Sequence, residues 1–304
     1  MPRPTSLQSM VEIARHEFAV ILKTRRASTA AFLYFATALV GSFLYVFSLE
    51  TLEEQLMGAL IAQGADPLSA AGSVSLMGSE AYEATLSFLV GADVEQLAAT
   101  FRQSPILPVC LWGSLAFLPA LIIITSFDQT VQDTQSRSIC YSLLRTSRGT
   151  ILMGKVLAHT LLFMILTALC CGVILALATH SLASFEPLAA IPGFLRIWAS
   201  LLPYGLCYLG ITALASASVN QSFAAMALSM AILFLFQVFE WFGALPPGSD
   251  YAFLSPLQWL SPGHYVRGLW LADPVQPLLS GGAMLLLAGG LLFGAVKILQ
   301  ARDL

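Results

Sequence analysis

Charged residues are scarce in this sequence. Only 10% of its 304 residues are Asp, Glu, Lys or Arg, whereas soluble domains usually carry about a quarter, so an ordinary soluble domain is excluded. The deficit is concentrated in charge-free runs at 27–49, 103–127, 156–185, 197–239 and 274–296. A bilayer-spanning helix needs about 20 apolar residues. The run 197–239 fits two spans, because the polar cluster SASVNQS divides it, and each of the others fits one.

Other features are absent as well. No series of short segments alternates between apolar and polar residues as the strands of a membrane barrel do, so we expect helices, which satisfy their backbone hydrogen bonds internally. No small-residue cleavage site follows the polar, basic first 27 residues, and we expect no cleavable signal peptide. None of the five cysteines lies in a predicted outer loop, so a disulfide framework is not indicated.

The predicted fold is an all-α polytopic membrane protein with six transmembrane helices. Basic residues concentrate on the cytoplasmic side of membranes, and with the N-terminus inside only Arg102, Arg196 and Arg267 lie outside. We therefore expect both termini in the cytoplasm. We interpret the membrane as a cell membrane, the bacterial inner membrane. The predicted divisions are a cytoplasmic N-terminus at 1–27, spans at 28–48, 106–127, 153–179, 196–216, 222–243 and 276–297, an external segment at 49–105, an inner loop at 128–152, an external or partly re-entrant loop at 244–275 and a cytoplasmic C-terminus at 298–304.

The N-terminal segment has a helical pattern of its own. Val11, Ala14, Phe18 and Ile21 recur at the spacing of one helix face within residues 8–26. Such a segment is predicted to be an amphipathic helix that lies in the membrane interface against lipids.

The two long outer segments also contain short helical patterns. Segment 49–105 has caps at Ser79 and Asp93, which predicts a small helical outer segment, either a packing lid or a surface for an external partner. It is strongly acidic, and no basic patch for nucleic acid occurs anywhere in the chain. The loop 244–275 is rich in Pro and aromatic residues, and Trp259 and Trp270 in it are of the type found at the bilayer interface.

The stretch SRGTILMGKVLAH contains most of a nucleotide-binding P-loop. Gly149 is followed at the usual spacing by Gly154 and Lys155, but Val156 stands where a Ser or Thr is needed for magnesium. No second ligand stands at metal spacing from His159. We therefore expect no catalytic, cofactor or metal residues, and interpret Lys155 as the inner boundary of the third span, with its ammonium reaching the lipid headgroups.

The segment FDQTVQDTQSRSICYSLLRTSRGTILMGKVLA, residues 127–158, resembles the first cytoplasmic loop of ABC-2 type permeases, the membrane subunits of type V ABC exporters. Asp133 stands at the acidic position of that motif, Leu143 and Leu144 at its leucine pair, Arg145 to Arg148 at its turn, and Gly154 and Lys155 at its close. Ser138 and Ile139 depart from the usual Gly-Thr, which leaves the start of the loop helix open.

The resemblance implies how such a chain works. In these exporters the loop is a coupling helix that docks on a separate ATPase subunit, which binds ATP and Mg. Two permeases and two ATPases form the working unit, with the second and fifth helices at the homodimer interface and the substrate between them. The residues that this assigns to coupling are Asp133, Arg137, Leu143, Leu144, Arg145 and Arg148. For each arginine the alternative is ordinary positive-inside charge.

A second group of polar residues falls near the predicted outer membrane surface. Glu240, beside Gln237, is an ionisable residue near the end of the fifth span, and such residues often mark a pathway or an interface. His264 and Arg267 follow in the last outer loop and are candidates to pair with it. Placement of Glu240 at headgroup level is the alternative. An ion-coupled transporter or a non-transporting membrane scaffold also remains open as a function.

Overall fold

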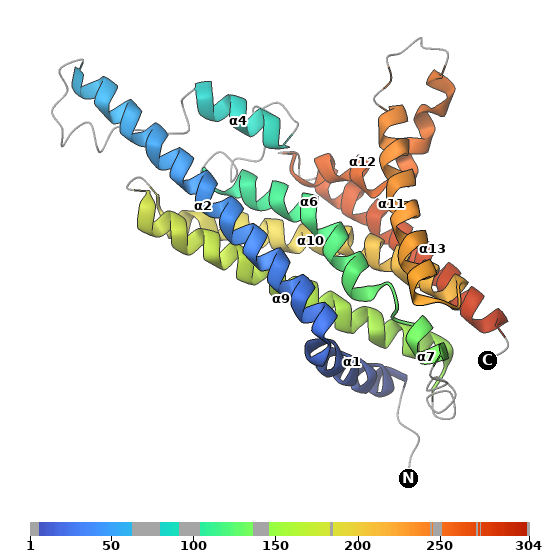
Figure 1. Ribbon diagram of the computed structural model, residues 1–304. Coiled ribbons are helices and arrows are strands. Elements are labelled where there is room, and N and C mark those ends of the chain that lie inside the picture. Colours follow the sequence, from blue (N-terminus) through green and yellow to red (C-terminus); the bar gives the residue numbers. More distant parts are fainter. Residues whose placement is uncertain are drawn as a thin grey trace.

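The computed structural model describes residues 6–62, 80–90, 104–135, 146–182, 185–243, 245, 251–271, 273 and 275–302. Every long regular element among them is an α-helix, and six helices are long and apolar enough to cross a membrane, as predicted. They are α2 (Arg25–Ala62), α6 (Leu107–Ser126), α9 (Arg148–Ser181), α10 (Pro187–Ser218), α11 (Ser222–Gly243) and α13 (Val275–Ala301). Figure 1 shows α2, α6, α9, α10 and α13 running side by side, with α11 rising away from them, and both ends of the chain at the same end, here called the inner end.

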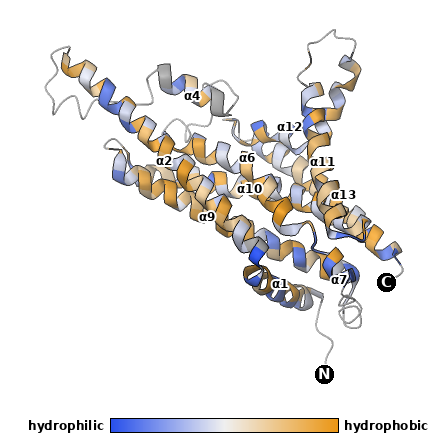
Figure 2. Cartoon of the chain, viewed as in Figure 1, coloured by the Kyte–Doolittle hydropathy of each residue, from blue (hydrophilic) through white to orange (hydrophobic). Residues whose placement is uncertain are grey.

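The helices form where the sequence is apolar, and several extend beyond the predicted spans. Helix α2 continues to Ala62, and α9 begins already at Arg148. Figure 2 shows the apolar residues along the middle of the bundle and the polar residues toward the helix ends and α1. Helix formation therefore continues into the polar flanks, because the backbone bonds of a helix propagate once its apolar part is formed.

Helix α10 is the centre of the bundle. In its most apolar stretch 61% of the residues are buried, against 17% in α11, and its buried side packs on α6, α9, α11 and α13. Gly210 allows α13 to come close, since a Cβ there would lie 2.9 Å from the Cβ of Leu291. Small residues at such crossings let membrane helices approach.

Buried hydroxyl groups join α10 to α6 and the turn that follows it. The Thr212 hydroxyl accepts a hydrogen bond of 2.9 Å from Ser126, and the hydroxyls of Ser216 and Thr130 are 2.6 Å apart. Farther from the inner end, the Tyr204 hydroxyl donates to the Leu115 carbonyl at 3.1 Å. Polar groups without partners are costly in a membrane, so these pairs fix how α6 and α10 face each other.

Helix α1 (Ser6–Lys23) lies across the inner end of the bundle (Figure 1). It buries Ala14 and Ile21 against α9 and exposes Leu7, Val11 and Leu22. The predicted helix is therefore confirmed, but Ala14 and Ile21 of its predicted lipid-facing side pack on α9, and its position in the membrane interface stays a prediction. It has two apolar sides: one packs on the bundle, and the other is suited to the membrane interface.

The outer end carries short helices. The helix predicted from the cap at Ser79 is confirmed as α4 (Glu80–Val90), which buries Tyr82 and Leu86 beside α6. The pattern that begins at Asp93 lies outside the described residues, and the external position of segment 49–105 stays a prediction. The last outer loop forms η3 (Ala252–Leu260), α12 (Pro262–Val266) and η4 (Arg267–Leu269). Trp259 is exposed there, but Trp270 is only 1% exposed. The interfacial position predicted for Trp270 is therefore wrong: the tryptophan fills the core under the loop.

Candidate functional site

The segment that leaves α6 at the inner end is held firmly before it enters the inner loop. After α6 the chain turns and forms the short helix α7 (Val131–Gln135). Val131 is fully buried against Phe127 and Ala225. The Gln135 amide donates 2.9 Å to the carbonyl of Asn220, in the turn between α10 and α11. Together with the hydroxyl pair at Thr130, these contacts fix α7 to α10 and α11.

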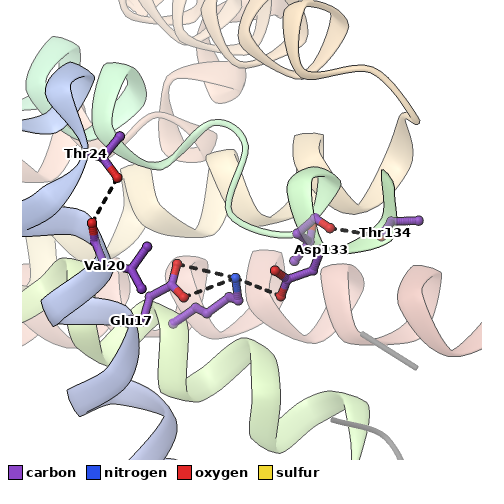
Figure 3. Close-up of polar contacts among 7 residues, drawn as sticks. Glu17, Val20, Thr24, Asp133 and Thr134 are labelled. Carbon is purple, nitrogen blue, oxygen red and sulfur yellow. Dashed lines mark hydrogen bonds and ion pairs between the residues drawn. The ribbon is translucent and has the colours of Figure 1, made fainter. Parts of the chain in front are cut away.

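A buried lysine joins α7 to two other elements. The Lys155 ammonium of α9 lies 2.9 Å from the Asp133 carboxylate of α7 and 3.3 Å from both carboxylate oxygens of Glu17 in α1. Figure 3 shows the ammonium between the two carboxylates. The lysine side chain is only 6% exposed, whereas the carboxylates retain 18% and 27% exposure. Three elements far apart in the sequence thus meet at one charge cluster.

The charge of the cluster explains why a lysine is tolerated there. Burying an ammonium without a partner costs several kcal/mol, and close carboxylates with good geometry offset this penalty. The expectation that Lys155 extends to the lipid headgroups is therefore wrong, because α1 covers it and supplies a carboxylate. Asp133, predicted to take part in coupling, is engaged by Lys155 within the same chain.

The neighbouring glycine makes this arrangement possible. A Cβ at Gly154 would lie 2.8 Å and 2.9 Å from two atoms of Ile13, so α1 and α9 touch directly at this point. Gly149 and Gly154 both belong to the continuous helix α9. Their backbone N–H groups follow a helical path, and the Gly-Lys pair serves helix packing and charge burial in this fold.

The C-terminal end of the inner loop, where α9 begins, is tied to α13. Ser147 caps α9 by accepting a bond from the Thr150 backbone N–H at 3.2 Å. Arg148 then donates to three carbonyls at the end of α13, those of Leu299, Gln300 (2.9 Å) and Arg302 (2.8 Å). A cation at the C-terminus of a helix is favourable for the helix dipole as well as for the unpaired carbonyls.

The chain end also returns to the α10–α11 turn. Arg302 donates 2.8 Å to the Asn220 side-chain oxygen, and the backbone of that same residue receives the bond from Gln135. Asn220 therefore connects α7 with the end of α13. The contacts of Lys155, Arg148 and Asn220 form one network around the inner end, hereafter the inner network.

The remaining predicted coupling residues cannot be placed in the inner network. Arg137, Leu143, Leu144 and Arg145 are outside the described residues. Sequence reasoning missed Glu17, Asn220 and Arg302 as members of the network. The sequence held no signal for them, because a lysine at the start of a long apolar run can equally reach the lipid headgroups.

The outer candidates come together only in part. The Glu240 carboxylate accepts bonds from the Ser261 hydroxyl and from the Gln237 amide at 3.4 Å, and Gly263 packs directly against it. Within the described part of the chain, Glu240 makes no ion pair with His264 or Arg267. Burial lowers the pKa of the His264 imidazole, although nearby Glu240 acts in the opposite direction.

These features define a class of protein. The described residues form six apolar helices with a polar network at one end, as in an α-helical, multi-pass membrane protein. Residues 11–264 match the family model of the ABC-2 family transporter proteins, and the chain belongs to that family. It is accordingly an ABC-2 transporter membrane protein. No curated protein matches the chain. Among the described residues, no group of three or more His, Cys, Asp or Glu is placed to hold a metal ion.

Proposed function

We propose that this chain is the permease subunit of an ABC exporter and takes its driving force from a separate ATPase subunit. Two ATPase copies bind and hydrolyse ATP with Mg, and a second permease copy completes a homodimer. The inner end then faces the cytoplasm, in agreement with its excess of basic residues. The chain itself contributes the path through the membrane and the connection to the ATPase.

The observation that carries this proposal is the inner network. Segment 128–152 contains α7 in its first part and the start of α9, at Arg148, in its last part. Both parts are tied to other helices by ionic or charge-assisted contacts. A loop that serves only as a connector needs no such anchoring. A loop that receives force does, because slack at its ends would absorb the displacement before it reached the spans.

The anchoring also divides the predicted coupling residues between two roles. Asp133 and Arg148 are used within the chain, where they hold the loop. We assign the contact with the ATPase to Arg137 and Arg145, whose charges suit acidic groups, with Leu143 and Leu144 as an apolar seat. Charged pairs at such an interface set specificity and association rate, and apolar anchors supply affinity.

Replacing Arg145 by Glu tests this division. The variant and the wild-type chain are purified together with the ATPase subunit from membranes of the native host, and co-purified ATPase and its activity are measured. We expect Arg145→Glu to lose about nine-tenths of the bound ATPase, since a reversed charge costs one to several kcal/mol at an interface. Arg15→Glu, an exposed change of the same kind on α1, is the matched control. Full ATPase recovery with Arg145→Glu would reject the docking role.

The outer residues keep a separate place in this proposal. Glu240 and Gln237 lie on α11, the least covered of the six spans, and the loop with His264 and Arg267 folds back beside them. We assign this group to the boundary with the second permease copy or to the outer end of the path. Glu240→Gln, which retains the hydrogen-bonding geometry with Ser261, separates a role of the charge from a role of the bond.

A further inference from the structure

The short turn between α10 and α11, residues 219–221, lies against the segment that leads into the inner loop. Val219 of the turn packs on Phe127 and Val131, and Ala225 in the first turn of α11 belongs to the same apolar cluster. Val131 is the first residue of α7. The start of α11 and the start of α7 therefore share one small core.

Asn220 connects this turn to two further elements through two different groups. Its backbone carbonyl accepts a bond from the Gln135 amide of α7 at 2.9 Å, and its side-chain oxygen accepts one from the Arg302 guanidinium at 2.8 Å. The second bond is charge-assisted, which makes it roughly twice as strong as a bond between neutral groups. A substitution of the Asn220 side chain removes the bond from Arg302 and leaves the bond from Gln135 in place.

These bonds close a ring at the base of the inner loop. Arg148, where α9 begins, donates to the Arg302 carbonyl at 2.8 Å. The path from Gln135 to Arg148 thus runs through Asn220 and connects the two ends of the loop without passing along the loop itself. Because the ring includes the α10–α11 turn, a displacement of the loop base displaces the turn as well.

Helix α11 is able to respond to such a displacement. In its most apolar stretch only 17% of the residues are buried, against 61% in α10. Its fully buried residues, Ala225 and Ser229, lie in its inner half, and Figure 1 shows the helix rising away from the other spans. A helix that is anchored at its inner end and little covered farther out changes its tilt when the anchor moves.

We propose that Asn220 is a positioning residue of the coupling site: it holds α7 in register with the end of α13 and passes the displacement of the inner loop to α11. This inference rests on the proposed function, because the displacement comes from the ATPase. The role differs from the docking role of Arg145, since Asn220 binds elements of its own chain. Loss of the Asn220 side chain therefore leaves the ATPase bound and weakens the response of α11.

A role in the turn alone is the alternative. Asparagine is common in turns, because its side chain bonds to the nearby backbone. The Asn220 side-chain oxygen instead accepts its bond from Arg302, 82 positions along the chain. A residue that only shapes the turn affects stability and has no effect on how α11 responds to nucleotide, so the two roles are separable by experiment.

Hydrogen exchange of the complex with its ATPase tests the proposal. The wild type, Asn220→Ala and Gln221→Ala are each purified with the ATPase subunit from membranes of the native host. Exchange along α11 is then measured by mass spectrometry with and without trapping by ATP and vanadate. We expect trapping to change exchange in wild-type α11, and the change to be about fivefold smaller in Asn220→Ala, the effect of one lost hydrogen bond. Gln221→Ala, which removes the next exposed amide of the turn, is the matched control and should respond like the wild type.

Two further variants separate the bond from the residue. Asn220→Asp keeps an oxygen that can accept from Arg302 and should retain the wild-type response. Arg302→Met removes the donor, keeps an unbranched stem and should reproduce the loss seen with Asn220→Ala. Unfolding temperatures show that the variants fold, and because the bond is removed from either side, a folding defect in one variant leaves the other to decide.

The outcomes distinguish this inference from the proposed function. A full response in Asn220→Ala, or an equal loss in Gln221→Ala, would overturn the positioning role. Loss of bound ATPase from Asn220→Ala would overturn it as well and would assign Asn220 to docking. A wild-type complex that binds the ATPase but shows no change in α11 would refute this inference alone, whereas a wild-type chain that brings down no ATPase would reject the proposed function and this inference with it.

Discussion

Replacing Lys155 by Met tests whether the charge cluster holds the inner end together. The substitution keeps an unbranched apolar stem but removes the ammonium that lies 2.9 Å from Asp133 and 3.3 Å from Glu17. Two carboxylates then share a site without a cation. Removing one partner of a buried ion pair costs about 3–5 kcal/mol. Because the carboxylates retain 18% and 27% exposure, we expect the lower value, about 3 kcal/mol in the free energy of unfolding.

The assay is unfolding of the purified chain in mixed micelles by increasing amounts of a denaturing detergent. Lys23→Met, at the exposed end of α1, is the matched control and is expected to change stability by less than about 0.5 kcal/mol. The triple variant Lys155→Met, Glu17→Gln, Asp133→Asn removes all three charges and should recover most of the loss, since replacing a whole buried ionic group is often nearly neutral. A triple variant no more stable than Lys155→Met, or an equal loss in the control, would refute this explanation.

Three further substitutions test contacts of the inner end and the core. Gly154→Ala should displace α1 and cost about 1–3 kcal/mol by overpacking; Ile13→Ala in the same chain should restore part of this, and an unchanged unfolding curve for Gly154→Ala would contradict the close contact. Arg148→Gln should speed hydrogen exchange of the last turn of α13, measured by mass spectrometry, because three carbonyls lose their donor; unaltered exchange there would show that the cap is dispensable. Thr212→Val should cost about 1 kcal/mol by leaving Ser126 one partner short, and a gain in stability would count against the hydroxyl pair.

The six spans could be predicted from the sequence because a membrane offers the backbone no other partner. Charge-free runs of the right length leave little choice but helices. The residues at which the helices begin and end were less predictable. The predicted second span is close to α6, whereas α2 continues through the polar stretch after Leu49 to Ala62. Hydropathy marks where a helix enters the membrane and gives no information on how far it continues in water.

The inner network could be predicted only in part. The loop motif led to Asp133 and Arg148, because both stand next to recognisable residues. Their partners could not be found in the same way, since Glu17 and the carbonyls of α13 are brought to them by the packing of distant helices. Lys155 illustrates the general difficulty: a terminal lysine looks the same in a sequence whether lipid headgroups or another helix will cover it.

The hydroxyl pairs between α6 and α10 have a mechanical consequence. Sliding these two helices past each other would break the bonds at Ser126 and Thr130, which are buried in the protein. They should therefore travel as one rigid spine throughout any working cycle. Displacement is left to the helices that are less covered, of which α2 keeps one bond to the segment before α6, from the Tyr45 hydroxyl to the Pro105 carbonyl at 2.8 Å. We therefore expect conformational change to occur at α2 and α11, the two least covered spans.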